Sequence, residues 1–249
     1  MYPVLFQVFG FPISSFGVML ALAFLAGTWL TALRMREVGL DPDGATTMLI
    51  YAMIGGIGGS KLYYAVDMAL RGELSFGSAL FSRSGITFYG GLIGAIAAVW
   101  VGTRIHRIPT NRFFNCVCLA GAIGQALGRI GCFLVGDDYG RVTDVPWGIA
   151  FPEGAPPTLE PVHPTQLYES AWLLAVTGWL WMRRGKSPLL WGEYLVLSGF
   201  GRFAIEFLRT NPRVAFGLSE AQLIALALVA VGAVCWLHQA RRSPAAVTA

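Results

Sequence analysis

The sequence contains few charged residues. Only 13% of its 249 residues are Asp, Glu, Lys or Arg, whereas soluble globular domains carry roughly 25%. Hydrophobic residues make up 55% of the chain, and the mean hydropathy is +0.59. This composition excludes an ordinary soluble domain and is typical of an integral membrane protein.

Other absences narrow the class further. The four cysteines, Cys116, Cys118, Cys132 and Cys235, form no C-x-x-C pair, so their spacing predicts neither a disulfide framework nor a zinc site. The first apolar segment lacks a basic flank and a small-residue cleavage site, so we expect it to be retained in the protein. No P-loop or repeat array is present, and a net charge of +4 is explained by membrane topology. We therefore expect no metal, cofactor or nucleic-acid partner.

Seven apolar segments approach the roughly 20 residues that a helix needs to cross a bilayer. They are Ser14 to Leu33, Gly44 to Val66, Ile86 to Thr103, Arg112 to Leu127, Gln166 to Met182, Leu190 to Phe207 and Ser219 to His238. The sequence thus predicts an all-α polytopic protein, with seven transmembrane helices in a single membrane domain over residues 1–249.

The basic residues in the connections predict the orientation, because cytoplasmic loops are enriched in Lys and Arg. One side holds Arg34, Arg36, Arg104, Arg107, Arg112, Arg183, Arg184, Lys186, Arg241 and Arg242. The other side has longer loops and holds Arg71, Arg83, Arg129, Arg141, Arg209 and Arg213. The first side is predicted to be cytoplasmic. With seven spans, the N-terminus is then periplasmic and the C-terminus cytoplasmic.

One connection is much longer than the others. It runs from Gly128 to Pro164, is rich in Gly and Pro, and carries several carboxylates. Loops of more than about 15 residues are usually functional or disordered, and the alternation of Trp147, Ile149 and Phe151 favours ordered structure. We predict a small periplasmic insertion at residues 129–165, between helices four and five.

Glycines are concentrated in three places within the apolar segments: positions 121, 124, 128 and 131, positions 55, 56, 58 and 59, and the pair Gly90 and Gly91. The first set repeats at intervals of three and four residues, which places it on one helix face. Small residues let neighbouring helices approach closely. The same glycines would also leave room for a lipid between helices.

Charged residues within a bilayer are costly and by default indicate function. Arg202, Glu206 and Arg209 share one helical face, at positions i, i+4 and i+7. A self-neutralising Arg–Glu pair with only a structural role is the alternative.

Arg129 and Arg141 flank a glycine-rich stretch with carboxylates, and guanidinium groups bind phosphate through two parallel hydrogen bonds. Further on, His163-Pro164-Thr165-Gln166-Leu167-Tyr168-Glu169 gathers an imidazole, an amide, a phenol and a carboxylate at the same membrane face. Together these groups predict one site, open to the outer leaflet, for an anionic lipid headgroup.

These motifs resemble those of the prolipoprotein diacylglyceryl transferases, seven-span enzymes of the bacterial inner membrane. The resemblance rests on Gly128-Arg129-Ile130-Gly131 continuing through Gly136, Gly140 and Arg141, on the stretch from His163 to Glu169, on Gly90 to Gly94, and on Arg202-Phe203, Glu206-Phe207 and Arg209. It implies transfer of the diacylglyceryl group from phosphatidylglycerol to the lipobox cysteine in the signal peptide of a preprolipoprotein. It also implies a multi-pass protein whose active site faces the periplasmic leaflet.

The resemblance implies roles for individual residues. Arg129 and Arg202 would hold the lipid phosphate, Arg141 and Arg209 would assist them, and Glu206 would orient Arg202. Asp137 would take the acidic position of the signature. The remaining substrate-binding candidates are Gln166, Tyr168, Glu169, Gly90, Gly91 and Gly140.

The chain departs from the family pattern at four positions: Phe16 replaces a Tyr, Tyr89 a His, and Cys132 and Val135 an Asn each. Tyr89, with an unperturbed pKa near 10, is a weak general base, so His163 is the second candidate. A divergent paralogue with another acceptor, or without activity, is an alternative reading of these changes. A light-driven pump is disfavoured because the seventh segment has no Lys, and a transporter because the halves show no internal symmetry.

Overall fold

The computed structural model describes residues 2–82, 85 and 87–242, and its described part is mostly helical. Its long helices are α1 (Ser15–Glu37), α2 (Asp43–Arg71), α4 (Phe88–Ile105), α5 (Thr110–Val135), α6 (Thr165–Arg183), α7 (Leu190–Ile205) and α8 (Glu220–Arg242). Each of the seven predicted segments therefore coincides with a helix. The predicted start of the third segment at Ile86, together with Arg83 and the tail from Ser243, lies outside the described residues.

Three of these helices, α1, α5 and α8, are long and apolar enough to cross a membrane, and a shorter apolar helix covers Tyr89–Ile105. Many large apolar side chains on them are exposed, including Leu25 at 68% and Ile93 at 64%. Apolar surface of this extent is stable in lipid rather than in water. The chain is accordingly a helical membrane protein.

The chain forms two compact units, residues 1–30 with 117–249 and residues 31–116. We refer to them as the first and the second unit. Helices α1 and α5 contribute residues to both.

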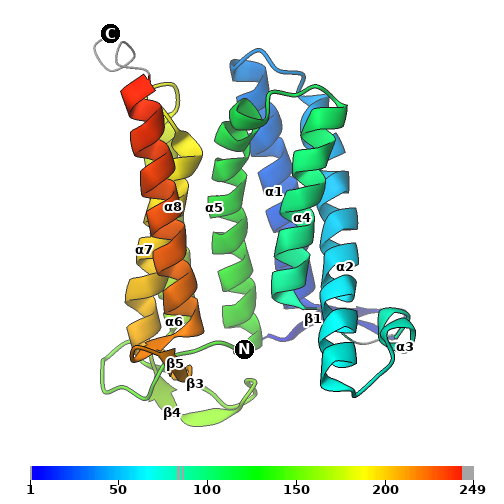
Figure 1. Ribbon diagram of the computed structural model, residues 1–249. Coiled ribbons are helices and arrows are strands. Elements are labelled where there is room, and N and C mark those ends of the chain that lie inside the picture. Colours follow the sequence, from blue (N-terminus) through cyan, green and yellow to red (C-terminus); the bar gives the residue numbers. More distant parts are fainter. Residues whose placement is uncertain (1, 83–84, 86, 243–249) are drawn as a thin grey trace. The chain divides into compact units, whose positions relative to one another are not determined.

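The second unit is built on the contact between α2 and α4, which run side by side (Figure 1). A Cβ atom added at Gly55, Gly59, Gly90 or Gly94 would collide with the backbone of the facing helix. The predicted close packing at these glycines is thus confirmed. The hydroxyl of Thr87 also donates to the carbonyl of Ser60 at 3.1 Å, and the short helix α3 (Phe76–Leu80) packs against α2.

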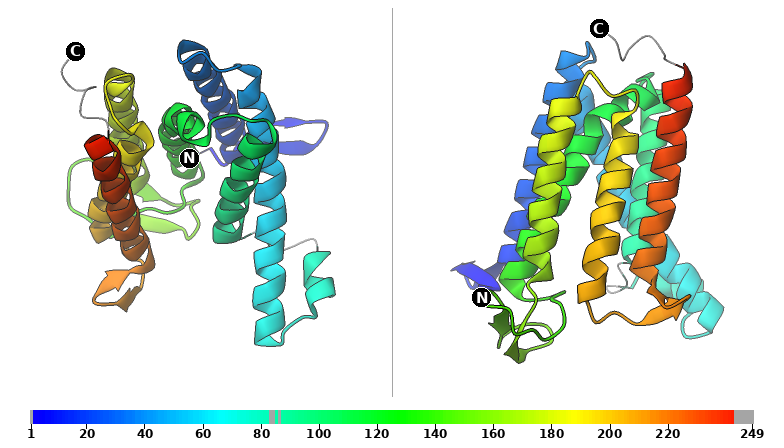
Figure 2. Two further views of the ribbon diagram at one scale, coloured as in Figure 1. Left: turned by 45° about the horizontal axis from the view of Figure 1, so that its top comes forward. Right: turned by 90° about the vertical axis from the view of Figure 1, so that its left-hand side faces the viewer.

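In the first unit, α7 packs against both α6 and α8 (Figure 2). The α7–α8 contact is close because Gly192 faces Gly232, whose carbonyl oxygen lies 3.1 Å from a Cβ placed at Gly192. A buried apolar core joins α5, α6 and α7 through Cys118, Leu119, Ala122, Val176, Leu180 and Leu190.

Three antiparallel hairpins complete the first unit: β1 (Val4–Val8) with β2 (Phe11–Ser14), β3 (Ile149–Phe151) with β4 (Thr158–Val162), and β5 (Arg213–Ala215) with β6 (Leu218–Ser219). The second and third lie at the same end of the unit (Figure 1). The β3–β4 hairpin confirms the ordered structure predicted for the long connection.

The predicted helix ends differ most from the structure at the fourth segment. The fourth segment was expected to end at Leu127, but α5 continues to Val135. Arg129 therefore lies on the helix and not in the insertion that was predicted to start at residue 129, and the turn after the helix begins only at Gly136, with a positive φ of 78°. Gly128 and Gly131 do not end the helix, because glycine is tolerated inside membrane helices.

Candidate functional site

Arg129 projects from the last two turns of α5, where the signature stretch begins. Its Nε pairs with the Glu169 carboxylate, and its Nη1 lies 2.7 Å from Oδ2 of Asp138. The first contact reaches α6 and the second reaches the turn after α5. Arg129 is thereby held from two directions.

Glu169, in the second turn of α6, is the centre of the site. Its side chain is only 6% exposed and pairs with Arg129 and with Nη1 of Arg202, and Nη1 of Arg209 lies 3.5 Å from its Oε1. A carboxylate this buried is stable only when paired. Glu169 therefore gathers guanidinium groups from two separate parts of the chain.

Arg202 and Arg209 lie on either side of Glu206: Arg202 is in the last turn of α7, and Arg209 directly follows the 3₁₀ turn Glu206–Leu208 that continues the helix. Oε2 of Glu206 is 3.0 Å from Nη2 of Arg202 and 3.7 Å from Nε of Arg209. These contacts bring the three side chains together, but Arg209 lies beyond the end of the helix and not on its face as predicted. The pairing of Glu206 with Arg202 is confirmed.

Glu206 is fully buried and is fixed by more than the arginines. Its Oε1 accepts hydrogen bonds from Nδ2 of Asn211 and Oγ of Ser219, both at 2.7 Å. Both donors follow α7, in the segment that leads through the β5–β6 hairpin to α8. Sequence reasoning missed them, because nothing in their spacing marks them as partners of Glu206.

The adjacent carboxylates Asp137 and Asp138 differ in their ion pairs and in the direction in which their pKa is shifted. Asp138 bridges Arg129 and Arg209, with its Oδ1 at 2.5 Å from Nη2 of Arg209. Burial tends to raise the pKa of Asp138, but Arg209 and Arg129 outweigh it and lower that pKa below its ordinary value. Asp137 has one carboxylate oxygen buried without a hydrogen-bond partner, and burial raises its pKa. The carboxylate that contacts the arginines is thus Asp138, one residue after the predicted one.

The turn after α5 is held by hydrogen bonds with the start of α6 and with the residue His163 just before it. Gln166 donates to the Asp137 carbonyl at 2.5 Å and Thr165 to the Asp138 carbonyl at 3.0 Å. Gly140 donates to the His163 carbonyl at 2.9 Å. A Cβ at Gly140 would lie 2.6 Å from the Leu208 carbonyl oxygen, so this close approach requires glycine. The predicted candidates Gln166 and Gly140 therefore shape the loop.

Other predicted residues lie near this loop without joining the arginines. Arg141 is exposed, and its main-chain N–H donates to the Leu208 carbonyl at 2.8 Å. Nδ1 of His163 is 3.3 Å from the hydroxyl of Tyr168, which accepts a hydrogen bond from Trp147 at 2.7 Å. In the part of the chain that the structure describes, Arg141, His163 and Tyr168 make no ion pair with the residues around Glu169.

Tyr89, Gly90 and Gly91 belong to the second unit, at the start of α4. Tyr89 is 37% exposed, and Gly90 packs closely against Gly59. Of the other departures from the family pattern, Phe16 packs in the first unit against Gly131, where a Cβ would lie 3.0 Å from its ring. Cys132 is half-buried on α5 and its thiol interacts with Asp137.

We call Arg129, Asp138, Glu169, Arg202, Glu206 and Arg209 the arginine cluster. Three guanidinium groups face three carboxylates, so the formal charges cancel. Even so, three buried atoms of these ion pairs make no hydrogen bond of normal geometry, namely Oε2 of Glu206 and Nε and Nη1 of Arg209. Buried N–H groups without acceptors are costly unless another group satisfies them. The cluster can therefore accept a further anionic oxygen.

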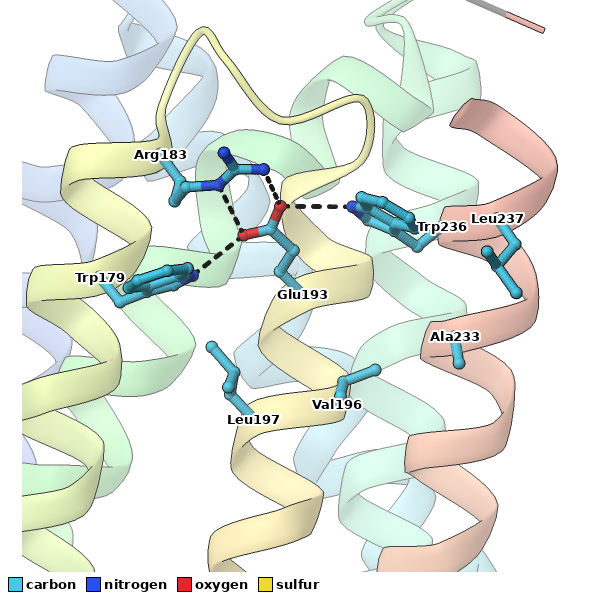
Figure 3. A pocket seen from close by; sticks show the side chains of 8 residues that line it. All are labelled: Trp179, Arg183, Glu193, Val196, Leu197, Ala233, Trp236 and Leu237. Atoms are coloured by element: carbon cyan, nitrogen blue, oxygen red, sulfur yellow. Dashed lines mark hydrogen bonds and ion pairs between the residues drawn. The ribbon is translucent and has the colours of Figure 1, made fainter. Parts of the chain in front are cut away.

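A second polar cluster lies in the same unit around Glu193, in the first turn of α7 (Figure 3). Its carboxylate accepts hydrogen bonds from the indoles of Trp179 (3.1 Å) and Trp236 (3.3 Å) and from Arg183 at 3.0 and 3.4 Å. An apolar pocket of about 460 Å³ adjoins it, with walls from Val196, Leu197, Ala233 and Leu237. This cluster ties α6, α7 and α8 together. Sequence reasoning missed it.

Known proteins match this chain along nearly its whole length. The family model described as "Prolipoprotein diacylglyceryl transferase" matches residues 3–238. A phosphatidylglycerol–prolipoprotein diacylglyceryl transferase of Clostridium tetani is 34% identical over 93% of this chain and 95% of its own length. A protein of the same name from Chromohalobacter salexigens is 31% identical over 97% of this chain and 93% of its own length. Another, from Aeromonas hydrophila, is 34% identical over 93% of this chain and 88% of its own length. The chain belongs to the prolipoprotein diacylglyceryl transferase family.

Proposed function

We propose that this protein transfers the diacylglyceryl group of phosphatidylglycerol to the lipobox cysteine of preprolipoproteins, the first step of bacterial lipoprotein maturation. The relatives are named for this reaction. The observation that carries the proposal is the arginine cluster, in which guanidinium groups from α5 and from the end of α7 meet at Glu169. Phosphate oxygens are the natural ligands of such a group.

The reaction requires the cysteine thiol to lose its proton and to attack the carbon of the diacylglyceryl group that is bonded to a phosphate oxygen. A C–S bond then forms while the C–O bond to the phosphate breaks. Glycerol phosphate leaves with the electron pair of that bond. Arg129 and Arg202 would stabilise the charge that develops on the phosphate, with Arg209 assisting, because preorganised cations act most strongly on charge that grows in the transition state.

The identity of the base is a separate part of the proposal. Tyr89 and His163 are the two candidates. Tyr89→His tests them: an increased transfer rate would assign proton removal to position 89, whereas an unchanged rate would favour His163. His163→Gln, assayed in parallel, should strongly reduce the transfer rate only if His163 is the base.

We further propose a single membrane domain with seven passes, α1, α2, α4, α5, α6, α7 and α8, in the bacterial inner membrane. The basic residues of the α6–α7 connection and of the end of α8 favour a cytoplasmic position for that end. The arginine cluster, at the other end of α6 and α7, would then face the periplasmic leaflet with the connection between α5 and α6, residues 136–164. Cysteine labelling at Asp144 and Lys186 with a membrane-impermeant reagent tests this, since only position 144 should react in intact spheroplasts.

The most direct functional test is complementation in cells depleted of their own transferase. Restored lipoprotein modification and growth would support the proposal. Failure by a well-expressed, membrane-inserted protein would instead favour a divergent paralogue, an alternative that the names of the relatives do not favour.

A further inference from the structure

Asp138 differs from the other two carboxylates of the arginine cluster in its exposure. Its side chain is 48% exposed, whereas those of Glu169 and Glu206 are 6% and 0% exposed. Glu206 is in addition fixed by Asn211 and Ser219. Asp138 is thus the one carboxylate of the cluster that water or a ligand reaches directly.

The geometry of Asp138 is that of a bridging oxyanion. Its two oxygens pair with two different arginines, Oδ2 with Arg129 at 2.7 Å and Oδ1 with Arg209 at 2.5 Å. The two non-bridging oxygens of a phosphodiester share one negative charge and can make the same pair of contacts. A carboxylate and a lipid phosphate would therefore compete for these two guanidinium groups.

The main chain at Asp138 is held without help from the carboxylate. The Asp138 carbonyl accepts from Thr165, and the preceding carbonyl accepts from Gln166. The backbone has a φ of 61°, a left-handed conformation that Asp, Asn and Gly adopt more readily than other residues. The side chain can therefore leave the arginines while the loop keeps its position.

We propose that the Asp138 carboxylate holds the place of the substrate phosphate between Arg129 and Arg209, and that phosphatidylglycerol displaces it on binding. This inference rests on the proposed function. Asp138 then lowers the apparent affinity for the lipid, because only the fraction of molecules with Asp138 displaced is ready to bind. It also keeps the arginines neutralised and in position between turnovers.

The test uses the full-length enzyme in mixed micelles, with Asp138→Asn as the main variant, since Asn keeps the shape and tolerates the left-handed backbone. The KM for phosphatidylglycerol should fall about three- to tenfold. The Kd for phosphatidylglycerol, measured without a peptide acceptor, should fall in parallel. Asp144→Asn removes the same charge from an exposed position of the same insertion and should leave both constants unchanged.

Asp138→Gly is the second variant, because glycine accepts the backbone conformation without strain. An unchanged or increased KM and Kd in both variants would overturn the proposal. So would loss of the folded protein in both, since the carboxylate would then be structural. A wild-type protein that binds phosphatidylglycerol no better than phosphatidylcholine would refute the proposed function itself. The Kd measurements on the wild-type protein therefore distinguish that result from a failure of the Asp138 proposal alone.

Discussion

The first unit holds two clusters of charged side chains, one near each end of α6. The Glu193 cluster has one carboxylate with four hydrogen bonds from Trp179, Trp236 and Arg183, and none of its side-chain atoms is among the buried unpaired atoms of the described residues. The arginine cluster has three carboxylates and three guanidinium groups, yet atoms of Glu206 and Arg209 remain without hydrogen bonds. Two ionic clusters in one helix bundle thus differ in what they have left to bind.

The difference separates a structural role from a binding role. A saturated carboxylate stabilises the helices that supply its donors and has no capacity for a ligand. An incompletely satisfied group of arginines keeps donors for an anion. Glu169 and Arg183 are 14 residues apart on α6, about 21 Å along the helix, so the two clusters can be perturbed independently.

The largest effect on the transfer rate should come from Arg129→Ala and Arg202→Ala in the arginine cluster. Each should reduce the transfer rate by at least about 100-fold, because each removes a cation from the phosphate in the transition state. Transfer of labelled diacylglyceryl to a lipobox peptide measures this. Arg183→Ala, which removes an arginine from the other cluster, should keep the rate within about twofold; an equal loss there would contradict the distinction.

Glu169→Gln should lower both the stability and the rate. Removing one partner of a buried ion pair costs about 3–5 kcal/mol, and here one carboxylate serves three arginines. Denaturant unfolding in detergent measures the loss. An unchanged free energy of unfolding would show that Glu169 does not organise the cluster.

Glu193→Gln should lower the stability without affecting catalysis. The amide keeps one acceptor but loses the charge-assisted hydrogen bonds to Arg183, so we expect a loss of about 1–3 kcal/mol in the free energy of unfolding. The transfer rate per folded molecule should equal that of the wild type. A reduced rate at full folding would assign the Glu193 cluster a role in catalysis.

Acid should disturb the arginine cluster through Asp138. Because the pKa of Asp138 lies below its ordinary value of 3.8, its ion pairs contribute stability that is fully present above that value. The contribution is lost as the pH falls through the lowered pKa. The measurement compares the unfolding temperatures of the wild type and Asp138→Asn between pH 6 and pH 3, about the range of carboxylate titration. The two temperatures should converge only at the acidic end. Convergence already at pH 6 would contradict the assignment.

The smallest effect is expected at Asp137. Because burial raises its pKa, its charged form is less favourable in the folded than in the unfolded protein at neutral pH. Asp137→Asn should therefore leave the unfolding temperature at pH 7 unchanged or slightly higher. A clear decrease would mean that the Asp137 charge has a stabilising partner.

The sequence predicted the helical segments and most members of the arginine cluster, because hydrophobic length and the i, i+4, i+7 spacing are local properties. It could not decide between Asp137 and Asp138. That choice depends on the left-handed turn at Gly136 and Asp138 and on hydrogen bonds from Thr165 and Gln166.

The Glu193 cluster was not predicted for a similar reason. Its donors Trp179, Arg183 and Trp236 lie 14, 10 and 43 residues from Glu193 along the chain. Only the packing of α7 against α6 and α8 brings them together. Such contacts have no periodicity that a single sequence reveals.

The central claim is that guanidinium groups from α5 and from the end of α7, Arg129 and Arg202 among them, hold the same lipid phosphate. A double-mutant cycle tests it most directly, through the Kd for phosphatidylglycerol of the wild type, Arg129→Ala, Arg202→Ala and the double variant. If both arginines bind one phosphate, the double variant should bind hardly more weakly than either single variant. Strictly additive losses in binding free energy would show that the two arginines act at separate places.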